Sequence, residues 1–168
     1  LWRWVADRYC APLASVLRPA LDAGVDVFQL REKDAPDDEI LRHAEIARAC
    51  CDEAGATFIL NDRPDLVEAA GADGVHVGQE DAPVAEARAT VGADRIVGLS
   101  THSPAQADAA DRAGVDYFCV GPVHATPTKA GRPAVGLEPV RHAARTATTP
   151  WFAIGGLNAR NVGEVLEA

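Results

Sequence analysis

Acidic and basic side chains gather directly after several short apolar runs of the sequence. Gln29, Arg31 and Lys33 alternate in the first cluster, so in an extended chain they lie on one side. Asp62 and Asp81 follow later apolar runs. Mg²⁺ prefers oxygen ligands and usually takes one or two carboxylates together with phosphate oxygens and water. The two aspartates are therefore candidate metal ligands for a bound diphosphate, whose remaining charge Arg31 and Lys33 would neutralise.

A third cation and two hydroxyl groups lie in residues 124–136, a Pro- and Gly-rich segment long enough to form a lid. Lys129 would add to the positive charge around the diphosphate. The hydroxyl groups of Thr126 and Thr128, with backbone N–H groups near Gly156, could bind a second phosphate, because successive backbone amides form anion sites. The clusters together predict a diphosphate bound with a divalent metal and, beside it, a separate monoester phosphate.

Each cluster also has a purely structural interpretation. Arg31 and Lys33 could be a solvated charge pair at a strand end. Asn61-Asp62 could form an Asx-turn or cap a helix that starts at Pro64, and Asp81 could be a helix N-cap. The threonines and glycines of the second phosphate site could serve only to shape loops. These interpretations weaken if all the clusters converge on one mouth of the fold.

A short repeated phrase predicts the elements that carry these residues. A helix ends, a Gly turns the chain and an Asp precedes a β-rich run; the copies are 23–26, 70–73, 91–94 and 113–116. The Gly suits a left-handed helix C-cap. Seven strands are expected, at 3–6, 25–30, 57–60, 74–77, 96–99, 117–120 and 151–154. Amphipathic helices are expected between them, among them 37–54, 83–91, 104–113 and 159–167.

Strands that alternate with helices predict a parallel sheet with right-handed crossovers. We therefore expect an α/β fold in one domain over residues 1–168, a (β/α)8 TIM barrel truncated at its C-terminus, with seven strands and the eighth βα unit missing. An open doubly wound sheet is the alternative. In a barrel of this kind the site lies at the C-terminal ends of the strands, where the polar clusters occur.

Composition limits the partners. The chain of 168 residues has 48% hydrophobic residues and a net charge of -9, which would repel nucleic acid and anionic membranes. No apolar run is as long as a membrane span, and the start lacks a signal pattern. The four cysteines show no metal-binding spacing and suit a reducing compartment. These features predict a cytoplasmic protein with small-molecule partners, and they leave a homo-oligomer open.

The order and spacing of six motifs resemble the thiamine phosphate synthase family through nearly the whole chain. The motifs are VFQLREK, ILNDRPDL, GVHVGQED, GLSTH, DYFCVGPVHATPTK and FAIGG. The resemblance implies a transferase that joins an aminopyrimidine diphosphate to a thiazole phosphate, carboxylated or not, and releases diphosphate. Its reaction is dissociative and assisted by Mg²⁺: diphosphate leaves, and the thiazole nitrogen captures the cation that the aminopyrimidine stabilises. No protein nucleophile is needed.

The resemblance also implies roles for individual residues. Pyrimidine diphosphate would be bound by Gln29, Leu30, Arg31, Glu32, Lys33, Asn61, Ser100 and Lys129. Of these, the catalytic residues would be Arg31, Lys33, Asn61 and Lys129. Asp62 and Asp81 would hold the metal. The thiazole phosphate would contact Thr126, Pro127, Thr128 and Gly156. His76, on a predicted strand, is a candidate for contacting the pyrimidine; His102 and His124 are weaker candidates.

Two other functions are compatible with parts of the sequence. A thiazole tautomerase of the same superfamily would use a histidine close to the position of Pro122, and His124 keeps that alternative open. Asn61, Asp62, Asp81 and Lys129 favour the synthase instead. The chain could also be a non-catalytic phosphate-binding fragment, because the predicted truncation removes a loop that binds the second phosphate in the resembled family.

Overall fold

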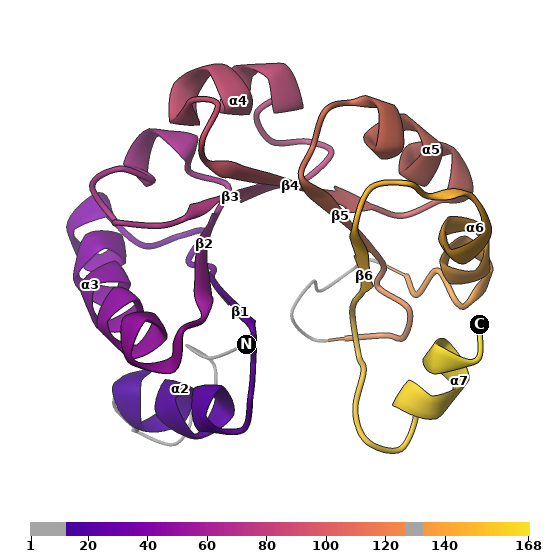
Figure 1. Cartoon of the computed structure of the whole chain (residues 1–168), viewed down its shortest axis with the longest axis horizontal. Coiled ribbons are helices and arrows are strands. Elements are labelled where there is room, and N and C mark those ends of the chain that lie inside the picture. Colours follow the sequence, from indigo (N-terminus) through magenta and orange to yellow (C-terminus); the bar gives the residue numbers. More distant parts are fainter. Residues whose placement is uncertain (1–12, 127–132) are drawn as a thin grey trace. The chain divides into compact units, whose positions relative to one another are not determined.

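The computed structural model describes residues 13–126 and 133–168 (Figure 1). Helices and strands alternate along these ranges, as the repeated phrase predicts. The elements are α2 (Leu13–Asp22), β1 (Val27–Leu30), α3 (Asp37–Ala54), β2 (Thr57–Asn61), η1 (Pro64–Leu66), β3 (Gly74–Val77), α4 (Val84–Val91), β4 (Ile96–Thr101), α5 (Pro104–Arg112), β5 (Tyr117–Val120), α6 (Glu138–Thr146), β6 (Trp151–Ala153) and α7 (Val162–Leu166).

Six of the seven expected strands are confirmed, each within two residues of its expected bounds. The expected strand at 3–6 lies outside the described residues. The helix expected at 37–54 matches α3 at both ends, while α7 is shorter than the expected 159–167. The α/β class with parallel strands is therefore confirmed, and closure into a barrel stays a prediction.

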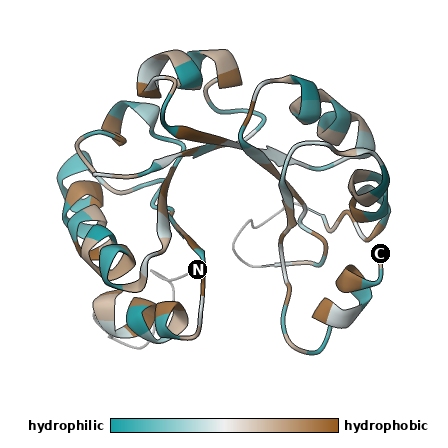
Figure 2. Ribbon diagram, viewed as in Figure 1, coloured by the Kyte–Doolittle hydropathy of each residue, from teal (hydrophilic) through white to brown (hydrophobic). Residues whose placement is uncertain are grey.

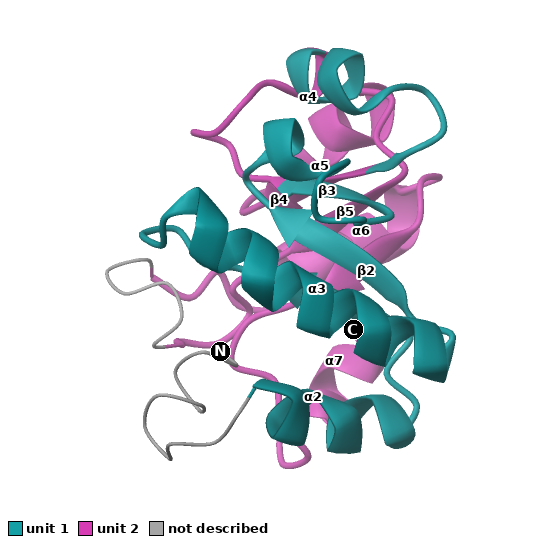
Figure 3. Ribbon diagram, turned by 90° about the vertical axis from the view of Figure 1, so that its left-hand side faces the viewer, with its two compact units in different colours: residues 1–76, 86–96 teal, residues 77–85, 97–168 magenta. Residues whose placement is uncertain are grey.

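The chain divides into two compact units, shown in different colours in Figure 3. The described part of the first unit comprises residues 13–76 and 86–96, and the second comprises 77–85, 97–126 and 133–168. In the first unit β1 pairs with β2 and β2 with β3, all parallel. In the second unit β4 pairs with β5 and β5 with β6, again parallel.

The first unit packs α3 against its strands through small buried residues. Ala44 and Ala47 of α3 are fully buried, as is Phe58 of β2, whose ring stacks on that of Phe28 with centroids 6.1 Å apart. Small helical side chains allow the close approach of helix to sheet that such an α/β layer requires. This packing holds the ends of β1 and β2 beside each other in register.

The glycines of the repeated phrase end helices and turns as predicted. Gly24, Gly71, Gly92 and Gly114 all have positive φ, between 62° and 91°. The long interval between the first two copies contains one more, Gly55, which caps α3 with φ 69° and donates its N–H to the helix. A Cβ would be strained in this left-handed conformation, so glycine marks each end.

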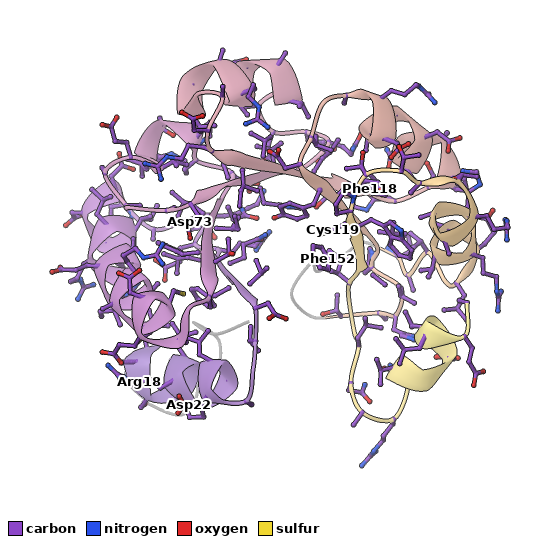
Figure 4. All side chains as sticks on the ribbon, viewed as in Figure 1. Arg18, Asp22, Asp73, Phe118, Cys119 and Phe152 are labelled. Atoms are coloured by element: carbon purple, nitrogen blue, oxygen red, sulfur yellow. The ribbon has the colours of Figure 1, made fainter. Side chains whose placement is uncertain are left out.

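The second unit buries an apolar cluster between β5 and the helices α5 and α6. Phe118 and Val120 of β5 pack with Ala107 of α5 and Val140 of α6. On the neighbouring strand β6, Phe152 is the register partner of Cys119 (Figure 4) and stays 48% exposed. α6 lies between β5 and β6, where a helix is expected although no bounds were predicted for it; its first turn contains Pro139, a residue that suits a helix start.

Hydropathy follows this architecture. Figure 2 shows mostly apolar strands, and helices that carry both apolar and polar residues. No helix in the described ranges is both long and apolar enough to cross a membrane.

Candidate active site

An ion pair joins the C-terminal ends of β1 and β2 in the first unit. Nζ of Lys33 lies 2.7 Å from Oδ2 of Asp62, and the aspartate side chain is 15% exposed against 43% for the lysine. The sequence places these residues 29 positions apart, and the parallel β1–β2 register brings them together. A cation and a mostly buried carboxylate thus meet where the barrel interpretation expects a site.

Asp62 has an unusual backbone conformation. Its φ is 61°, and among the described residues it is the one non-glycine residue with positive φ. Its N–H donates to the carbonyl of His76 at 2.8 Å. Aspartate tolerates this left-handed conformation better than most residues, but such strain gathers at functional sites. No sequence signal predicts this conformation, because Asp62 could equally have begun a helix.

Two buried donors near this pair have no acceptor. Nε of Arg31 and Nδ2 of Asn61 are buried, and neither has a hydrogen-bond partner in the part of the chain that the structure describes. A buried donor without an acceptor is unfavourable by roughly 1–3 kcal/mol. Donors of this kind suit a bound anion or heteroaromatic acceptor, so the two side chains fit the predicted binding site.

The remaining residues of the QLREK segment divide between core and helix contacts. Leu30 is buried at the end of β1, and Gln29 pairs in register with Ile59. The carboxylate of Glu32 is turned to α3, where Nδ1 of His43 lies 2.8 and 2.9 Å from its two oxygens. No sequence motif includes His43, so its contact with Glu32 was not predicted.

His76 lies on β3 beside the Asn61-Asp62 pair. It is 4% exposed and is the register partner of Asn61. Neither Asn61 nor Asp62 caps η1, whose N-cap position is Arg63 without a side-chain cap, so the capping interpretation of this pair is not realised. A contact between His76 and a pyrimidine stays a prediction.

In the second unit Asp81 closes the loop after β3. Its Oδ2 accepts the N–H of Gly78 at 2.9 Å. A Cβ on Gly78 would lie 2.6 Å from that same oxygen, so glycine allows the carboxylate its position. Asp81 therefore shapes its own loop rather than capping α4, which begins at Val84.

Polar groups at the C-terminal end of β4 connect to this loop and to the end of β5. Gln79 donates from Nε2 to the carbonyl of Ser100 at 2.7 Å, and Ser100 itself is buried. Thr101 donates its hydroxyl to the carbonyl of Cys119 at 3.0 Å. Nδ1 of His102 contacts the carbonyl of Gly121, so this histidine supports a loop.

The loops after β5 and β6 approach each other closely. A Cβ on Gly156, whose φ is 69°, would lie 2.7 Å from Cβ of His124 and 2.9 Å from the carbonyl oxygen of Ala125. Nε2 of His124 lies 3.0 Å from Oε1 of Glu164 in α7. The two segments predicted to bind a second phosphate, which contain Thr126 and Gly156, therefore adjoin within this unit. Pro127, Thr128 and Lys129 lie outside the described residues.

The first unit also has a cleft at the opposite, N-terminal ends of its strands. Its volume is about 770 Å³, and its charged lining residues are Arg48, Asp52, Asp73, Asp94 and Arg95. Arg48 donates to Asp73 at 2.9 Å and pairs with Asp52 at 2.8 Å. The charges are thus largely paired with one another, and none of the predicted site residues lines this cleft.

The carboxylates expected to hold a metal belong to different units, Asp62 to the first and Asp81 to the second. Within the described residues there is no group of three or more His, Cys, Asp or Glu side chains arranged to hold a metal ion. The expectation of two aspartates with substrate oxygens requires no such group, and it stays a prediction.

The family model described as thiamine monophosphate synthase matches residues 4–168. The chain belongs to this family. The synthase resemblance inferred from six motifs is thereby confirmed.

Named relatives agree with the family assignment. The chain is 52% identical over 158 residues to the thiamine-phosphate synthase of Acidothermus cellulolyticus, covering 93% of the chain and 74% of that protein. It is 47% identical over 156 residues to the thiamine-phosphate synthase of Synechocystis, covering 93% of the chain and only 46% of that protein. The chain thus spans three quarters of one relative and less than half of another. The predicted class of enzyme, a thiamine-phosphate synthase and so a transferase, is confirmed for the family.

Solved structures support the fold. Thiamine phosphate pyrophosphorylase from Pyrococcus furiosus matches with a TM-score of 0.85 and 34% identity, covering 95% of this chain and 77% of that one. An HpcH/HpaI aldolase from Desulfitobacterium hafniense matches with a TM-score of 0.57 at 14% identity, covering 92% and 78% of the two chains. The second likeness supports the α/β fold alone.

Proposed function

We propose that the protein to which this chain belongs joins an aminopyrimidine diphosphate to a thiazole phosphate, giving thiamine phosphate and diphosphate. The observation that carries the proposal is the cluster at the ends of β1 and β2. There a lysine–aspartate pair at 2.7 Å lies with buried donors of Arg31 and Asn61 that have no acceptor among the residues that the structure describes. The names and identities of the family's members support the same reaction.

The first unit supplies most of the pyrimidine diphosphate site in this proposal. Arg31 and Lys33 bind diphosphate oxygens, Arg31 through its planar fork and Lys33 as a point charge. Asn61 donates to the substrate from its buried amide, which has no other acceptor in the described ranges. Gln29, Ser100 and Lys129 complete the set, and His76 contacts the pyrimidine.

Mg²⁺ would be held by the carboxylates of Asp62 and Asp81. The donors fit the ion, because carboxylate oxygens are the ligands it prefers. The ion supplies charge neutralisation to the departing diphosphate. Lys33 already neutralises Asp62 at 2.7 Å, so the carboxylate lies in a position suited to a cation. That both aspartates serve one ion is part of the proposal, since they belong to different units.

The second unit holds the thiazole phosphate in this proposal. Thr126, Pro127 and Thr128 are consecutive in the sequence, and Gly156 lies against His124 and Ala125, which directly precede them. The positive φ of Gly156 and its lack of Cβ let backbone N–H groups approach an anion closely. A side chain at that position would meet the backbone of Ala125 instead of leaving room for phosphate.

Catalysis then rests on the departure of diphosphate and on orientation. Arg31, Lys33 and Lys129 stabilise the leaving group as negative charge develops on it, and Asn61 holds the pyrimidine ring. The thiazole nitrogen captures the resulting cation, so no protein nucleophile is used. The protein contributes by holding both substrates and excluding water from the cation.

We further propose that the strands belong to a (β/α)8 barrel, in keeping with the fold of the relatives, and that the enzyme works in the cytoplasm. The full-length protein, incubated with pyrimidine diphosphate, thiazole phosphate and Mg²⁺, should form thiamine phosphate, detected by mass spectrometry. EDTA should abolish product formation, and added Mg²⁺ should restore it. Absence of product from folded full-length protein would refute the proposal. Proton exchange on the thiazole without the pyrimidine would favour a tautomerase instead.

A further inference from the structure

Glu32 lies between the two cations of the QLREK segment, yet its carboxylate contacts neither. Its side chain is only 3% exposed, and both of its oxygens lie within 2.9 Å of Nδ1 of His43 on α3. The next residue, Lys33, contacts Asp62 at the end of β2. Neighbouring residues of this short segment are thus fixed to two different elements, one to a helix and one to a strand end.

The position of this segment depends on side chains. The β1–β2 register ends at Leu30 with Leu60, and α3 begins at Asp37, so residues 31–36 belong to neither a strand nor a helix. The Glu32–His43 pair connects this stretch to α3, whose buried face packs in the core of the first unit. A buried, hydrogen-bonded pair holds a chain segment more firmly than an exposed one.

We infer that His43 is a positioning residue for the pyrimidine diphosphate site and acts through Glu32, an inference that rests on the proposed function. Without His43, the buried carboxylate would lack its donor and would be attracted to the adjacent cations, Arg31 and Lys33. Those cations would then be drawn away from the diphosphate. His43 itself touches no substrate; it keeps Glu32 from competing with one.

The two ring nitrogens of His43 allow a sharp test. Asn places an amide where Nδ1 lies, whereas the longer Gln places its amide nearer the position of Nε2. His43→Asn therefore keeps a donor for Glu32, while His43→Gln and His43→Ala lose it. A matched control exists in the second unit: Nε2 of His142 on α6 lies 2.7 Å from Asp108, and its side chain is 21% exposed against 20% for His43.

The full-length variants should be compared by steady-state kinetics for each substrate and by thermal unfolding. We expect His43→Ala and His43→Gln to raise KM for the pyrimidine diphosphate about tenfold, as losses of supporting contacts commonly do, with KM for the thiazole phosphate unchanged. His43→Asn should stay within about threefold of the wild type. His142→Ala should change Tm without changing either KM.

Three other outcomes would contradict the inference or the proposed function. Equal kinetics for His43→Gln, His43→Asn and the wild type would overturn the inference, and that comparison stands even if His43→Ala does not fold. A parallel rise in both KM values, or a change in Tm alone, would show a general structural role and overturn it too. Wild-type protein that forms no thiamine phosphate would refute the proposed function, and the inference that rests on it would fall with it.

Discussion

The two ends of the strands in the first unit satisfy their polar groups in different ways. At the N-terminal ends, Asp73 accepts the N–H of Phe58 at 2.7 Å and a guanidinium nitrogen of Arg48 at 2.9 Å. At the C-terminal ends, Asp62 has a strained backbone, and buried donors of Arg31 and Asn61 lack acceptors among the described residues. Nε of Arg48 also lacks one, but both terminal nitrogens of that side chain are paired.

A cleft alone therefore does not mark the site. The cleft of about 770 Å³ lies at the N-terminal ends, where charges pair with one another and hold the strands in place. The candidate chemistry lies at the other ends, where hydrogen-bonding capacity is left over for a ligand. In barrels of this class, the first end serves stability and the second serves catalysis. Substitutions at the N-terminal ends should therefore lower stability, and substitutions at the C-terminal ends should lower activity.

The largest expected effect comes from Asp62 at the C-terminal ends. Asn has nearly the same shape and tolerates positive φ, so Asp62→Asn removes the charge with little change of backbone. We expect the rate of thiamine phosphate formation to fall by roughly 10²–10³-fold, as losses of transition-state electrostatics do. The unfolding midpoint should change little, because the partner Lys33 is 43% exposed and such pairs contribute about 0–1 kcal/mol.

Asp65→Asn is the matched control for this variant. Asp65 lies three residues further on and pairs with Arg63 at 2.6 Å on the surface. We expect its turnover to equal that of the wild type. Normal turnover in Asp62→Asn, or an equal loss of turnover in the two variants, would contradict the assignment of catalysis to the C-terminal strand ends.

The next largest effect is expected from a substitution of Asp73 at the N-terminal strand ends, which should lower the stability of the protein. Asp73→Ala leaves the N–H of Phe58 and the guanidinium of Arg48 without this acceptor. We expect a loss of about 1–3 kcal/mol in the free energy of unfolding, measured by urea denaturation, with kcat/KM within twofold of the wild type. A loss of activity without destabilisation would show that the N-terminal strand ends take part in the reaction, and it would contradict the comparison.

The repeated phrase provides a second copy of this contact. Asp116, before β5, accepts the N–H of Val97 at 2.7 Å just as Asp73 accepts that of Phe58. Asp116→Ala should therefore destabilise the protein to a similar degree. A stable Asp116→Ala variant would show that the contact matters in the first unit alone.

Two glycines with similar φ make a smaller and finer comparison. Gly156→Ala would bring a Cβ within 2.9 Å of the carbonyl oxygen of Ala125, whereas Gly92→Ala, at φ 89°, meets nothing within 4 Å. Both should lose about 1 kcal/mol of stability from backbone strain, and Gly156→Ala should lose more because its Cβ also clashes with the backbone of Ala125. Only Gly156→Ala should raise KM for the thiazole phosphate, by about tenfold. Equal KM values for the thiazole phosphate in the two variants would show that Gly156 does not contribute to the phosphate site.

Much of the framework could be predicted from the sequence because its signals are local. The glycine C-caps follow from one residue type with one backbone preference, and α3 from its apolar periodicity between clear ends. The clustering of Lys33 with Asp62 could be expected because parallel strands place their C-terminal ends together. These are consequences of short-range rules applied to a regular fold.

The unpredicted features depend on contacts between distant segments. The pairing of Glu32 with His43 needs the packing of α3, and it turned a predicted ligand toward a helix. Asp62, with its positive φ, donates its N–H to the carbonyl of His76, a contact with the next strand that no local pattern indicates. The paired charges of the N-terminal cleft likewise join residues up to 25 positions apart, as Arg48 and Asp73 are. No local pattern encodes such distances.

The smallest expected effect concerns Cys51, which lines the N-terminal cleft yet is fully buried. Burial raises the pKa of its thiol to about 11, and the nearby charge of Arg48 only partly offsets this. The thiol should therefore resist iodoacetamide at pH 8 in the folded protein and react in urea, as read by peptide mass spectrometry. The unfolded chain loses this proton first, so stability should fall as pH rises from about 9 to about 11. Rapid native labelling would mean that this end opens, and its paired charges would then not hold the strands as the comparison requires.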